Sequence, residues 1–374
     1  MDTSGVHIIA FDVPYPADYG GVIDIFYKIK CLSEKGIKIH LHVFEYGRKP
    51  SKELEVICEK VYYYKRKGWS ALFSIRPYII ESRGNWELLA NLRKNKWSIL
   101  FEGLHTCYFL HHKELAQRNK LVRLHNIEHH YYQQLSDNEK NIFKKIYYLI
   151  ESKKLEWFQI ILAKANHLLA ISDKDFEYFK LKFPNQSTDK LQPWLAYNKV
   201  NIQKGKGSYI LYHANLSVAE NENAVLLLIK NVFSKINTPF IIAGKNPSKK
   251  IYEAVKSQPH GKLIGNPDEN NLSELISNAH IHLLYSLQNT GIKLRLFNAL
   301  YNGKFCIANN RILEGTSLEK LCQVCNSYEE IISTIQSLLN KDFDEEEINK
   351  RKNFFSLNFN NESNTNKLIE ILRQ

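Results

Sequence analysis

The sequence lacks long apolar runs, and this shortage limits where the protein can reside. A membrane-spanning helix needs about 20 consecutive apolar residues. The apolar stretch near Ile160 comes nearest, but Lys164, Asn166 and His167 interrupt it. No charged segment followed by an apolar one precedes the first predicted strand, so we expect no signal peptide. These absences predict a cytoplasmic protein, with peripheral attachment to the inner face of the cytoplasmic membrane left open.

Cysteine is also scarce, which argues against a cysteine-rich metal centre. The six cysteines are scattered, and only Cys322 and Cys325 form a C-x-x-C pair. Neither a second pair nor a nearby histidine accompanies them, so zinc binding or redox chemistry is only weakly indicated. We therefore predict half-buried thiols in a reducing compartment.

Acidic residues are too few to balance the basic ones. Lysine and arginine together number 51 against 39 aspartates and glutamates, which gives a formal net charge of +12. A basic protein favours anionic partners such as nucleic acid, anionic lipid or phosphorylated small molecules. Composition alone does not choose among these three classes.

What the sequence does contain is a regular alternation of short apolar strands with helical stretches. Several strands are apolar on both faces, which is typical of buried parallel strands. The alternation therefore predicts doubly wound parallel sheets, an α/β fold. Strands are expected near residues 6–13, 38–44, 60–64, 97–101, 120–125, 167–171, 208–213, 239–243, 261–265, 280–285, 305–308 and 323–325.

The alternation occurs twice, so we predict two Rossmann-like domains of similar size. The first covers residues 1–195 and the second covers residues 196–350. A helical tail over 351–374 is expected to pack back toward the first domain. The segment 183–208 is rich in Pro, Gly, Asn, Lys and Ser, and we interpret it as the linker between the domains.

Ligands of such sheets bind beyond the carboxyl ends of the strands, so the residues that follow each strand are the first candidates. In the first domain, Gly20 and Gly21 stand between a strand and a helix, where paired glycines let the backbone approach a ligand. They do not form the G-x-G-x-x-G dinucleotide motif. Asp173 and Asp175 resemble a D-x-D metal motif, but we favour a helix cap with acids in its first turn. The polar candidates after the first, fourth and fifth strands are Tyr19, Glu102, His105, His125, Asn126 and Glu128.

The segment "NTGIKLRLFNALYNGKFCIANN", residues 289–310, is the strongest candidate in the second domain. A helix follows Gly291, and its first turns carry Lys293 and Arg295, although helix N-termini prefer acidic side chains. An anionic ligand would explain this, because backbone N–H groups of residues 290–293 would hold a diphosphate and Lys293 would add a charge. The alternative is that Lys293 and Arg295 simply face solvent. For Arg295 the sequence does not decide between a ligand contact and a solvent-exposed position. Asn215, Lys245 and Asn266 follow other strands and suit polar ligand contacts.

Three segments carry a family resemblance: "PYPADYGGVIDIFYKIKCLSEKGIKIHLHVF", "LHNIEHHYY" and residues 289–310. They resemble GT-B glycosyltransferases, close to the retaining family 4 and its bacterial group 1 branch, over nearly the whole chain. The resemblance implies two domains facing a central cleft, with the acceptor held by the first and a nucleotide-diphosphate sugar by the second. It implies hexosyl transfer with retention, without a metal or other cofactor, to a cell-surface glycan, lipid-linked or protein glycan acceptor. The setting would be bacterial polysaccharide biosynthesis.

The sequence departs from this family at the donor side. Many members have two glutamates eight positions apart around the helix, where Thr290 and Asn298 stand here. An Arg/Lys pair that often follows the first strand of the second domain is also missing. Lys293, with Lys245 or Arg295, would then have to balance the diphosphate charge.

The resemblance and the strand-end positions together suggest roles. Lys293 would stabilise the departing nucleoside diphosphate, and His125 would position donor and acceptor. With retention, the donor phosphate itself takes the acceptor proton; with inversion, Glu128 or His105 would be the base. The donor-side candidates are Gly20, Gly21, Asn215, Lys245, Asn266, Thr290, Gly291, Ile292, Arg295 and Asn298, and the acceptor-side candidates are Tyr19, Glu102, His105 and Asn126.

Two other functions remain as alternatives. A nucleotide-sugar epimerase could use the same fold, but it would need acid/base carboxylates that are missing beside Thr290. A non-enzymatic basic protein could bind nucleic acid or membrane through residues 62–69 or 141–164, which interleave bases with aromatic residues. No nucleic-acid recognition motif is present, so we expect no nucleic acid as partner.

Overall fold

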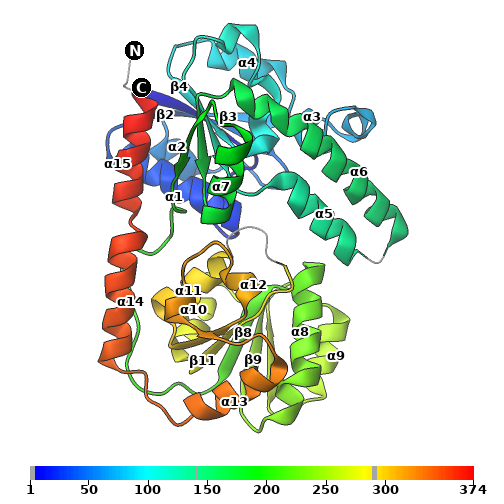
Figure 1. The fold of residues 1–374 in the computed structure, drawn as a ribbon, viewed down its shortest axis with the longest axis vertical. Helices are drawn as coiled ribbons and strands as arrows, with labels where there is room; N and C mark the ends of the chain where they lie inside the picture. The colour runs from blue at the N-terminus through cyan, green and yellow to red at the C-terminus, as the bar shows by residue number, and fades with distance from the viewer. Residues whose placement is uncertain (1–4, 140, 289–292) are drawn as a thin grey trace. The chain divides into compact units, whose positions relative to one another are not determined.

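The computed structural model describes residues 5–139, 141–288 and 293–374. The chain divides into two compact units: unit 1 comprises Met1–Ala196 with Asn360–Gln374, and unit 2 comprises Tyr197–Phe359. Each unit holds one parallel sheet covered by helices (Figure 1). The predicted α/β class, with two Rossmann-like parallel-sheet units, is therefore confirmed.

The sheet of unit 1 has seven strands in the order β3-β2-β1-β4-β5-β6-β7. The winding direction changes between β1 and β4, and such a point is where ligands of open α/β sheets bind. Strands β1, β4, β5 and β6 are buried at every position, as parallel strands covered on both faces are. The strands are β1 (Gly5–Ala10), β2 (Lys38–Glu45), β3 (Lys60–Lys65), β4 (Ser98–Glu102), β5 (Lys120–Leu124), β6 (His167–Ala170) and β7 (Ser187–Lys190).

Strand β7 corrects the interpretation of residues 183–208 as a linker. Its sequence, Ser-Thr-Asp-Lys, has no apolar residue and gives no period-2 signal. It pairs with β6 alone and forms the edge of the sheet. An edge strand has one side exposed, so a polar sequence suits it, and lysine there discourages pairing with another chain.

The helices of unit 1 fill the connections between strands, and the last helix of the chain joins them. Helix α15 lies against α1 (Figure 1). The Trp194 indole donates to Thr365 Oγ1 at 2.9 Å, and Ser98 Oγ donates to the Leu372 carbonyl at 2.8 Å. The helices are α1 (Gly20–Glu34), α2 (Lys52–Ile57), α3 (Tyr78–Glu81), α4 (Trp86–Leu92), α5 (Glu128–Asn138), α6 (Ile142–Phe158), α7 (Asp173–Lys182) and α15 (Asn361–Leu372), with 3-10 turns η1 (Trp69–Phe73), η2 (Leu104–Phe109), η3 (Lys113–Leu115) and η4 (Gln159–Lys164).

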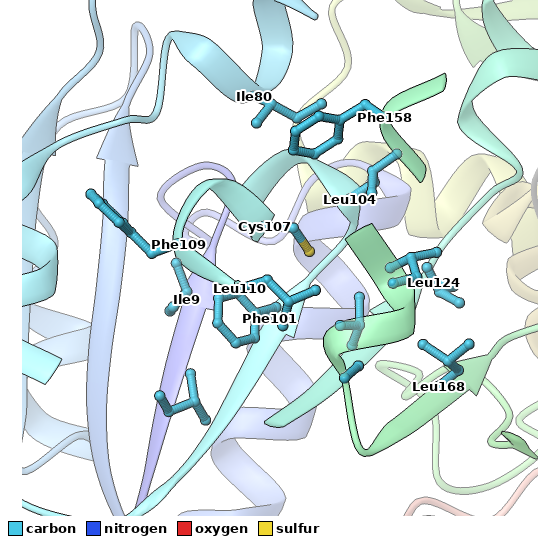
Figure 2. Packing of buried hydrophobic residues seen from close by; sticks show 14 of the residues in the cluster. Ile9, Ile80, Phe101, Leu104, Cys107, Phe109, Leu110, Leu124, Phe158 and Leu168 are labelled. Carbon is cyan, nitrogen blue, oxygen red and sulfur yellow. The ribbon is translucent and has the colours of Figure 1, made fainter. Parts of the chain in front are cut away.

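The core of unit 1 lies on both faces of its sheet, as the period-2 geometry of strands requires. Ile9 of β1 belongs to the cluster on one face, while its neighbours Ile8 and Ala10 belong to the cluster on the other. Figure 2 shows the first cluster, in which side chains of η2 such as Cys107 meet those of β4 and α6. Burying each large apolar side chain contributes roughly 1.5–3 kcal/mol.

A chain of polar side chains also runs through this core. His7 Nδ1 lies 2.9 Å from His42 Nε2, and His42 Nδ1 lies 2.8 Å from the Tyr64 hydroxyl. Burial lowers the pKa of His7 to about 3 and the pKa of His42 well below its usual value. Both rings are therefore neutral near pH 7.

The sheet of unit 2 has six parallel strands in the order β10-β9-β8-β11-β12-β13. Its first connection runs from β8 through α8 to β9, and the winding direction changes between β8 and β11. The strands are β8 (Ile210–Asn215), β9 (Phe240–Lys245), β10 (Gly261–Gly265), β11 (Ile281–Leu284), β12 (Phe305–Ala308) and β13 (Gln323–Val324). The helices are α8 (Ala219–Asn231), α9 (Lys249–Lys256), α10 (Glu269–Asn278), α11 (Leu294–Asn302), α12 (Asn310–Leu313), α13 (Tyr328–Leu338) and α14 (Glu345–Asn358), with the short turns η5 (Phe233–Lys235) and η6 (Glu319–Leu321).

Three smaller predictions can be compared with the structure directly. The Ser172 side chain caps α7 by accepting from the Asp175 amide, so the capping interpretation of this acidic segment is confirmed. The six cysteines all carry free thiols, and burial raises the pKa of both Cys322 and Cys325. Among the residues that the structure describes, no helix combines the length and the apolar character needed to cross a membrane.

Candidate functional site

The carboxyl ends of β1, β4 and β5 form the candidate site of unit 1, because these strands are neighbours in the sheet. The segments that follow them carry the side chains predicted from the sequence. Helix α1 begins at Gly20, after the loop of residues 11–19 that follows β1. A Cβ on Gly21, the second residue of α1, would lie 2.5 Å from the Phe11 ring, so a side chain at this position would force that ring to move.

His125 follows β5 and is held in place by a buried carboxylate. Its Nε2 lies 3.0 Å from Glu102 Oε2, and because an ionised carboxylate only accepts, Nε2 carries the proton. Glu102 was predicted to face the ligand side, but it is fully buried and reaches that side only through His125. Burial alone would raise the pKa of Glu102, yet the Lys28 ammonium and His125 outweigh it and hold this pKa below its usual range.

Glu102 is one member of a buried network of four charges. Lys28 Nζ donates to Glu102 Oε1 at 2.7 Å and to Asp24 Oδ2 at 2.9 Å. Arg123 contacts Asp24 Oδ1 at 3.2 Å, and the Trp194 amide donates to the same oxygen at 2.8 Å. These charged side chains are 0–2% exposed, and their two positive and two negative charges balance. Balanced, hydrogen-bonded charges are the form in which ionic groups are tolerated inside proteins.

The same network contains a set of potential metal ligands. One atom each of Asp24, Glu102 and His125 lies within 4.8 Å of the others. Carboxylate and imidazole groups in such a cluster could hold a divalent cation. The Lys28 ammonium, however, already bonds to both carboxylates. A cation would have to displace it, so the cluster is better described as a scaffold that positions His125.

A second pair of titratable groups lies beside His125. His105 Nδ1 is 3.7 Å from Glu128 Oε1, which is longer than a hydrogen bond. Burial raises the pKa of Glu128 to about 8, although a hydrogen bond from Asn126 opposes the shift. Burial lowers the pKa of His105 well below its usual value. At pH 7 Glu128 is therefore largely protonated, which suits a hydrogen-bond donor better than a base.

The loop after β1 presents Tyr19, which is 40% exposed. Its hydroxyl donates to Asp12 Oδ2 at 2.9 Å, and the Arg48 guanidinium lies 5.0 Å from its ring. Arg48 also donates to the Pro16 carbonyl at 2.6 Å, so it fixes this loop against the one after β2. A pocket of about 650 Å³ opens between these two loops and is lined by Tyr15, Pro16, Asp18, Gly47, Arg48, Lys49, Pro50, Ser51, Lys52 and Glu53.

The strand ends of unit 2 hold the predicted asparagines in tight turns. Asn215 Oδ1 accepts from the Ser217 hydroxyl at 2.8 Å, and Asn266 Oδ1 accepts from the Asn246 amide at 2.8 Å. A Cβ on Gly244 would lie 1.8 Å from the Ala214 carbonyl, so β8 and β9 end in close backbone contact that only glycine allows. Lys245, the next residue, is exposed at the end of β9.

The two basic residues at the start of α11 are not equivalent. Arg295 donates to the Tyr212 hydroxyl at 3.0 Å, to Asn221 Oδ1 at 3.3 Å and to the Tyr285 carbonyl at 2.8 Å. Its guanidinium thus ties β8, α8 and the end of β11 together. Lys293 stands at the N-cap position of α11. Burial lowers its pKa, and Glu220 opposes this shift.

Glu220 itself is a buried carboxylate that no pattern in the sequence indicated. It accepts from the Ser286 hydroxyl at 2.8 Å and from the Leu287 amide at 2.6 Å, and so it fixes the segment that follows β11. With Lys293 and Arg295 it leaves a net charge of +1 at this strand end. Asn298 lies one turn further along α11, where its Oδ1 accepts from Asn302 at 3.0 Å. Thr290, Gly291 and Ile292 lie outside the described residues.

Asp24, Lys28 and Arg123 were also missed. A signal was available for the first two, because they stand four residues apart on a helix whose residues Val22, Ile25, Ile29 and Leu32 are apolar. Two charges at helical spacing inside an apolar pattern indicate a buried ion pair. Nothing in the sequence indicated that Arg123, within β5, would be their partner.

Comparison with known proteins supports the fold assignment. No family model matches the chain. A 44.6 kDa protein from the cps region of Klebsiella pneumoniae is 27% identical over 346 residues, covering 87% of this chain and 88% of that protein. A glycosyltransferase of Rickettsia africae has a similar structure, with a TM-score of 0.68 and 15% identity over 100% of this chain and 98% of that one. HepE of Anabaena, solved in complex with UDP and glucose, is also similar, with a TM-score of 0.67 and 11% sequence identity over 99% of both chains. The fold is therefore that of GT-B glycosyltransferases.

Proposed function

We propose that this protein is a glycosyltransferase that moves a sugar from a nucleotide-diphosphate sugar to a glycan acceptor. The observation that carries the proposal is the likeness of the whole chain to solved glycosyltransferases, one of them bound to UDP and glucose. The relative from a cps region favours a role in capsule polysaccharide biosynthesis. A cell-surface glycan on a lipid or protein carrier is the acceptor that we propose, which would bring the enzyme to the cytoplasmic face of the membrane.

Unit 2 is the proposed donor side, as in the family that the sequence resembles. Lys293 supplies the charge for the diphosphate, because Arg295 is engaged in bonds that hold the strand ends together. Lys245, Asn215, Asn266 and Asn298 are candidates for contacts with the sugar or nucleoside. A lysine ammonium can neutralise a leaving diphosphate without a metal ion, so we propose metal-independent transfer.

The state of Glu128 favours retention over inversion. An inverting enzyme needs a base, and a carboxyl whose pKa is about 8 is largely protonated at neutral pH. His105, the other candidate, is less basic than usual because it is buried. In a retaining reaction the donor phosphate can take the acceptor proton, while His125, fixed by Glu102, contacts the sugar. The anomeric configuration of the product, measured by NMR, tests this proposal.

Nucleoside diphosphates are expected to stabilise the protein against heat. One that is present at 100 times its dissociation constant contributes about 2.7 kcal/mol of apparent stability. A thermal-shift screen of UDP, GDP, ADP and CDP should yield one strong stabiliser, and the corresponding nucleoside should stabilise much less. No shift with any of the four would contradict the proposed donor class. Incubation of the matching nucleotide sugar without acceptor would reveal an epimerase instead.

Lys293→Ala is expected to lower kcat about 100-fold, the size of effect seen when one charge-stabilising group is removed from an active site. The melting temperature should stay close to that of the unaltered protein, since removal of a half-buried ammonium at a helix start relieves its desolvation and leaves no large cavity. Lys249→Ala, at the start of α9 in the same unit, provides the matched control and should keep full activity. A variant Lys293→Ala with near-normal turnover would remove this lysine from the proposed mechanism.

A further inference from the structure

Helix α6 has two apolar faces, although a surface helix needs only one. Leu155 and Phe158 point inward and are buried in the core of unit 1. The opposite face carries six large apolar side chains that are 42–80% exposed: Ile142, Phe143, Ile146, Leu149, Ile150 and Trp157. At 3.6 residues per turn, all six positions fall along one side of the helix. We call this set the outer stripe.

A second exposed apolar group lies beside the outer stripe. Trp69, Phe73 and Ile75, in and just after η1, are 82–90% exposed. Lys154 of α6 donates to the Ser74 carbonyl at 3.0 Å, so this segment lies against α6. Figure 1 shows α6 with α5 as a helical pair at the margin of unit 1. A monomeric soluble protein rarely exposes so many neighbouring apolar side chains without a partner.

The charges around the outer stripe are mainly positive. Helix α6 carries Lys144, Lys145, Lys153 and Lys154 against only Glu151 and Glu156. The two glutamates pair with two of these lysines, Glu151 with Lys154 and Glu156 with Lys153, so the helix keeps an excess of two positive charges. Lys145 is exposed at the start of the helix, and Lys153 is exposed on the same side as the outer stripe, whereas Lys144 lies on the opposite side, in line with Leu155. Long lysine stems lie along an apolar surface while their ammonium groups extend outward.

This combination of charge and apolar surface selects one class of partner. A second copy of the chain would bring two lysine-rich stripes together, and like charges would oppose that contact. An anionic bilayer accepts both features, because apolar side chains enter the interface while lysines meet the headgroups. We propose that the outer stripe of α6, with Trp69, Phe73 and Ile75, is a docking surface for an anionic lipid bilayer. The proposal does not depend on sugar transfer.

Vesicle sedimentation tests the apolar part of the surface. The wild-type protein should bind vesicles that contain phosphatidylglycerol and should bind pure phosphatidylcholine vesicles at least tenfold more weakly. The triple variant Ile146→Ser, Ile150→Ser, Trp157→Ser should lose at least tenfold in partition. The matched control replaces Val56, Leu181 and Leu357 by Ser, since these residues are 83–86% exposed on other helices. The control should bind like the wild type, and both triple variants should melt near the wild-type temperature.

Charge reversal tests the electrostatic part. Lys145→Glu with Lys153→Glu should weaken binding to the anionic vesicles about 30-fold, because each basic residue near such a surface contributes about 1 kcal/mol. Lys249→Glu with Lys250→Glu, an exposed lysine pair on α9, is the control and should leave binding unchanged. Equal binding of stripe variant and wild type would overturn the proposal. So would light scattering that shows a dimer of the wild type and a monomer of the stripe variant. Because no sugar donor is present, a protein inactive as a transferase can still pass this test.

Discussion

Lys28→Met is expected to lower the free energy of unfolding by about 3–5 kcal/mol, the usual cost of removing one partner from a buried ion pair. Lys28 is fully buried and bonds to Asp24 and Glu102 together. Arg123 would still compensate Asp24, but Glu102 would keep a buried charge without its ammonium partner. Urea denaturation followed by circular dichroism measures the effect.

Two further variants test whether the loss of stability comes from the buried ion pairs of Lys28. Lys30→Met changes the same residue type on the same helix at an exposed position, and it should alter stability by less than about 0.5 kcal/mol. The double variant Lys28→Met, Glu102→Gln removes both charges and should recover part of the loss. Equal effects of Lys28→Met and Lys30→Met would show that the network contributes nothing to stability.

Acidification from pH 6.5 to pH 5.5 is expected to destabilise the protein by several kcal/mol. Burial lowers the pKa of ten histidines, and the five that are most deeply buried carry the largest effect: His7 and His213 have pKa values of about 3, and those of His42, His105 and His282 lie well below the usual value. Below pH 6.5 the unfolded chain protonates these rings, whereas the folded protein keeps them neutral. The unfolded state then binds more protons, so stability falls as the pH falls, by up to about 1.4 kcal/mol per pH unit for each ring.

The carboxyl group of Glu128 opposes this loss of stability on acidification, and those of Asp24 and Glu102 do not contribute to it between pH 6.5 and 5.5. The pKa of Glu128 is raised, so the folded state gains a proton at this position, and stability from it grows as the pH falls from about 8 toward 4.5. Asp24 and Glu102 have lowered pKa values, and the stability that they contribute is lost only below about pH 4.5. The net expected loss between pH 6.5 and 5.5 is on the order of 4 kcal/mol.

Urea titrations at the two pH values measure the loss directly. His42→Phe should reduce the pH dependence, because it removes one of the rings that take up a proton on unfolding. His260→Gln, at an exposed position, should leave the pH dependence unchanged. Stability that stays constant between pH 6.5 and 5.5 would mean that water or protons reach these rings in the folded state.

The strand and helix positions could be predicted because both depend on local patterns. Strands β10 and β12 match their predicted residues, and most others differ by one to three. Apolar runs of the buried strands and the glycine after α1 carried enough signal. Strand β7 had none, because an edge strand is held by its neighbour β6 and not by its own apolar residues. Local apolar patterns therefore do not predict pairing between strands that are far apart in the sequence.

In the candidate site, too, the position of a side chain on its element could be predicted from the local sequence, but its bonding partners could not. The pattern around Lys293 and Arg295 predicted a helix start with two bases, but not that Arg295 would turn back to Tyr212 and Tyr285. Likewise, Glu102 was placed correctly at the end of β4, while its partner Lys28 is 74 residues away. Spacing along the chain locates a residue on an element. Which atom it bonds to is decided by neighbours that the fold brings in from elsewhere.

Helix α15 has a consequence for how the protein is made. Its residues Leu368, Ile369, Ile371 and Leu372 belong to a core cluster of unit 1, whose other members come from the first part of the chain. A ribosome must therefore translate all of unit 2 before the last piece of unit 1 emerges. Until α15 has been made, the apolar surface that this helix covers in unit 1 is exposed to solvent, and such surfaces bind chaperones or aggregate. Emergence of α15, and not completion of the first unit's strands, would be the moment at which unit 1 closes.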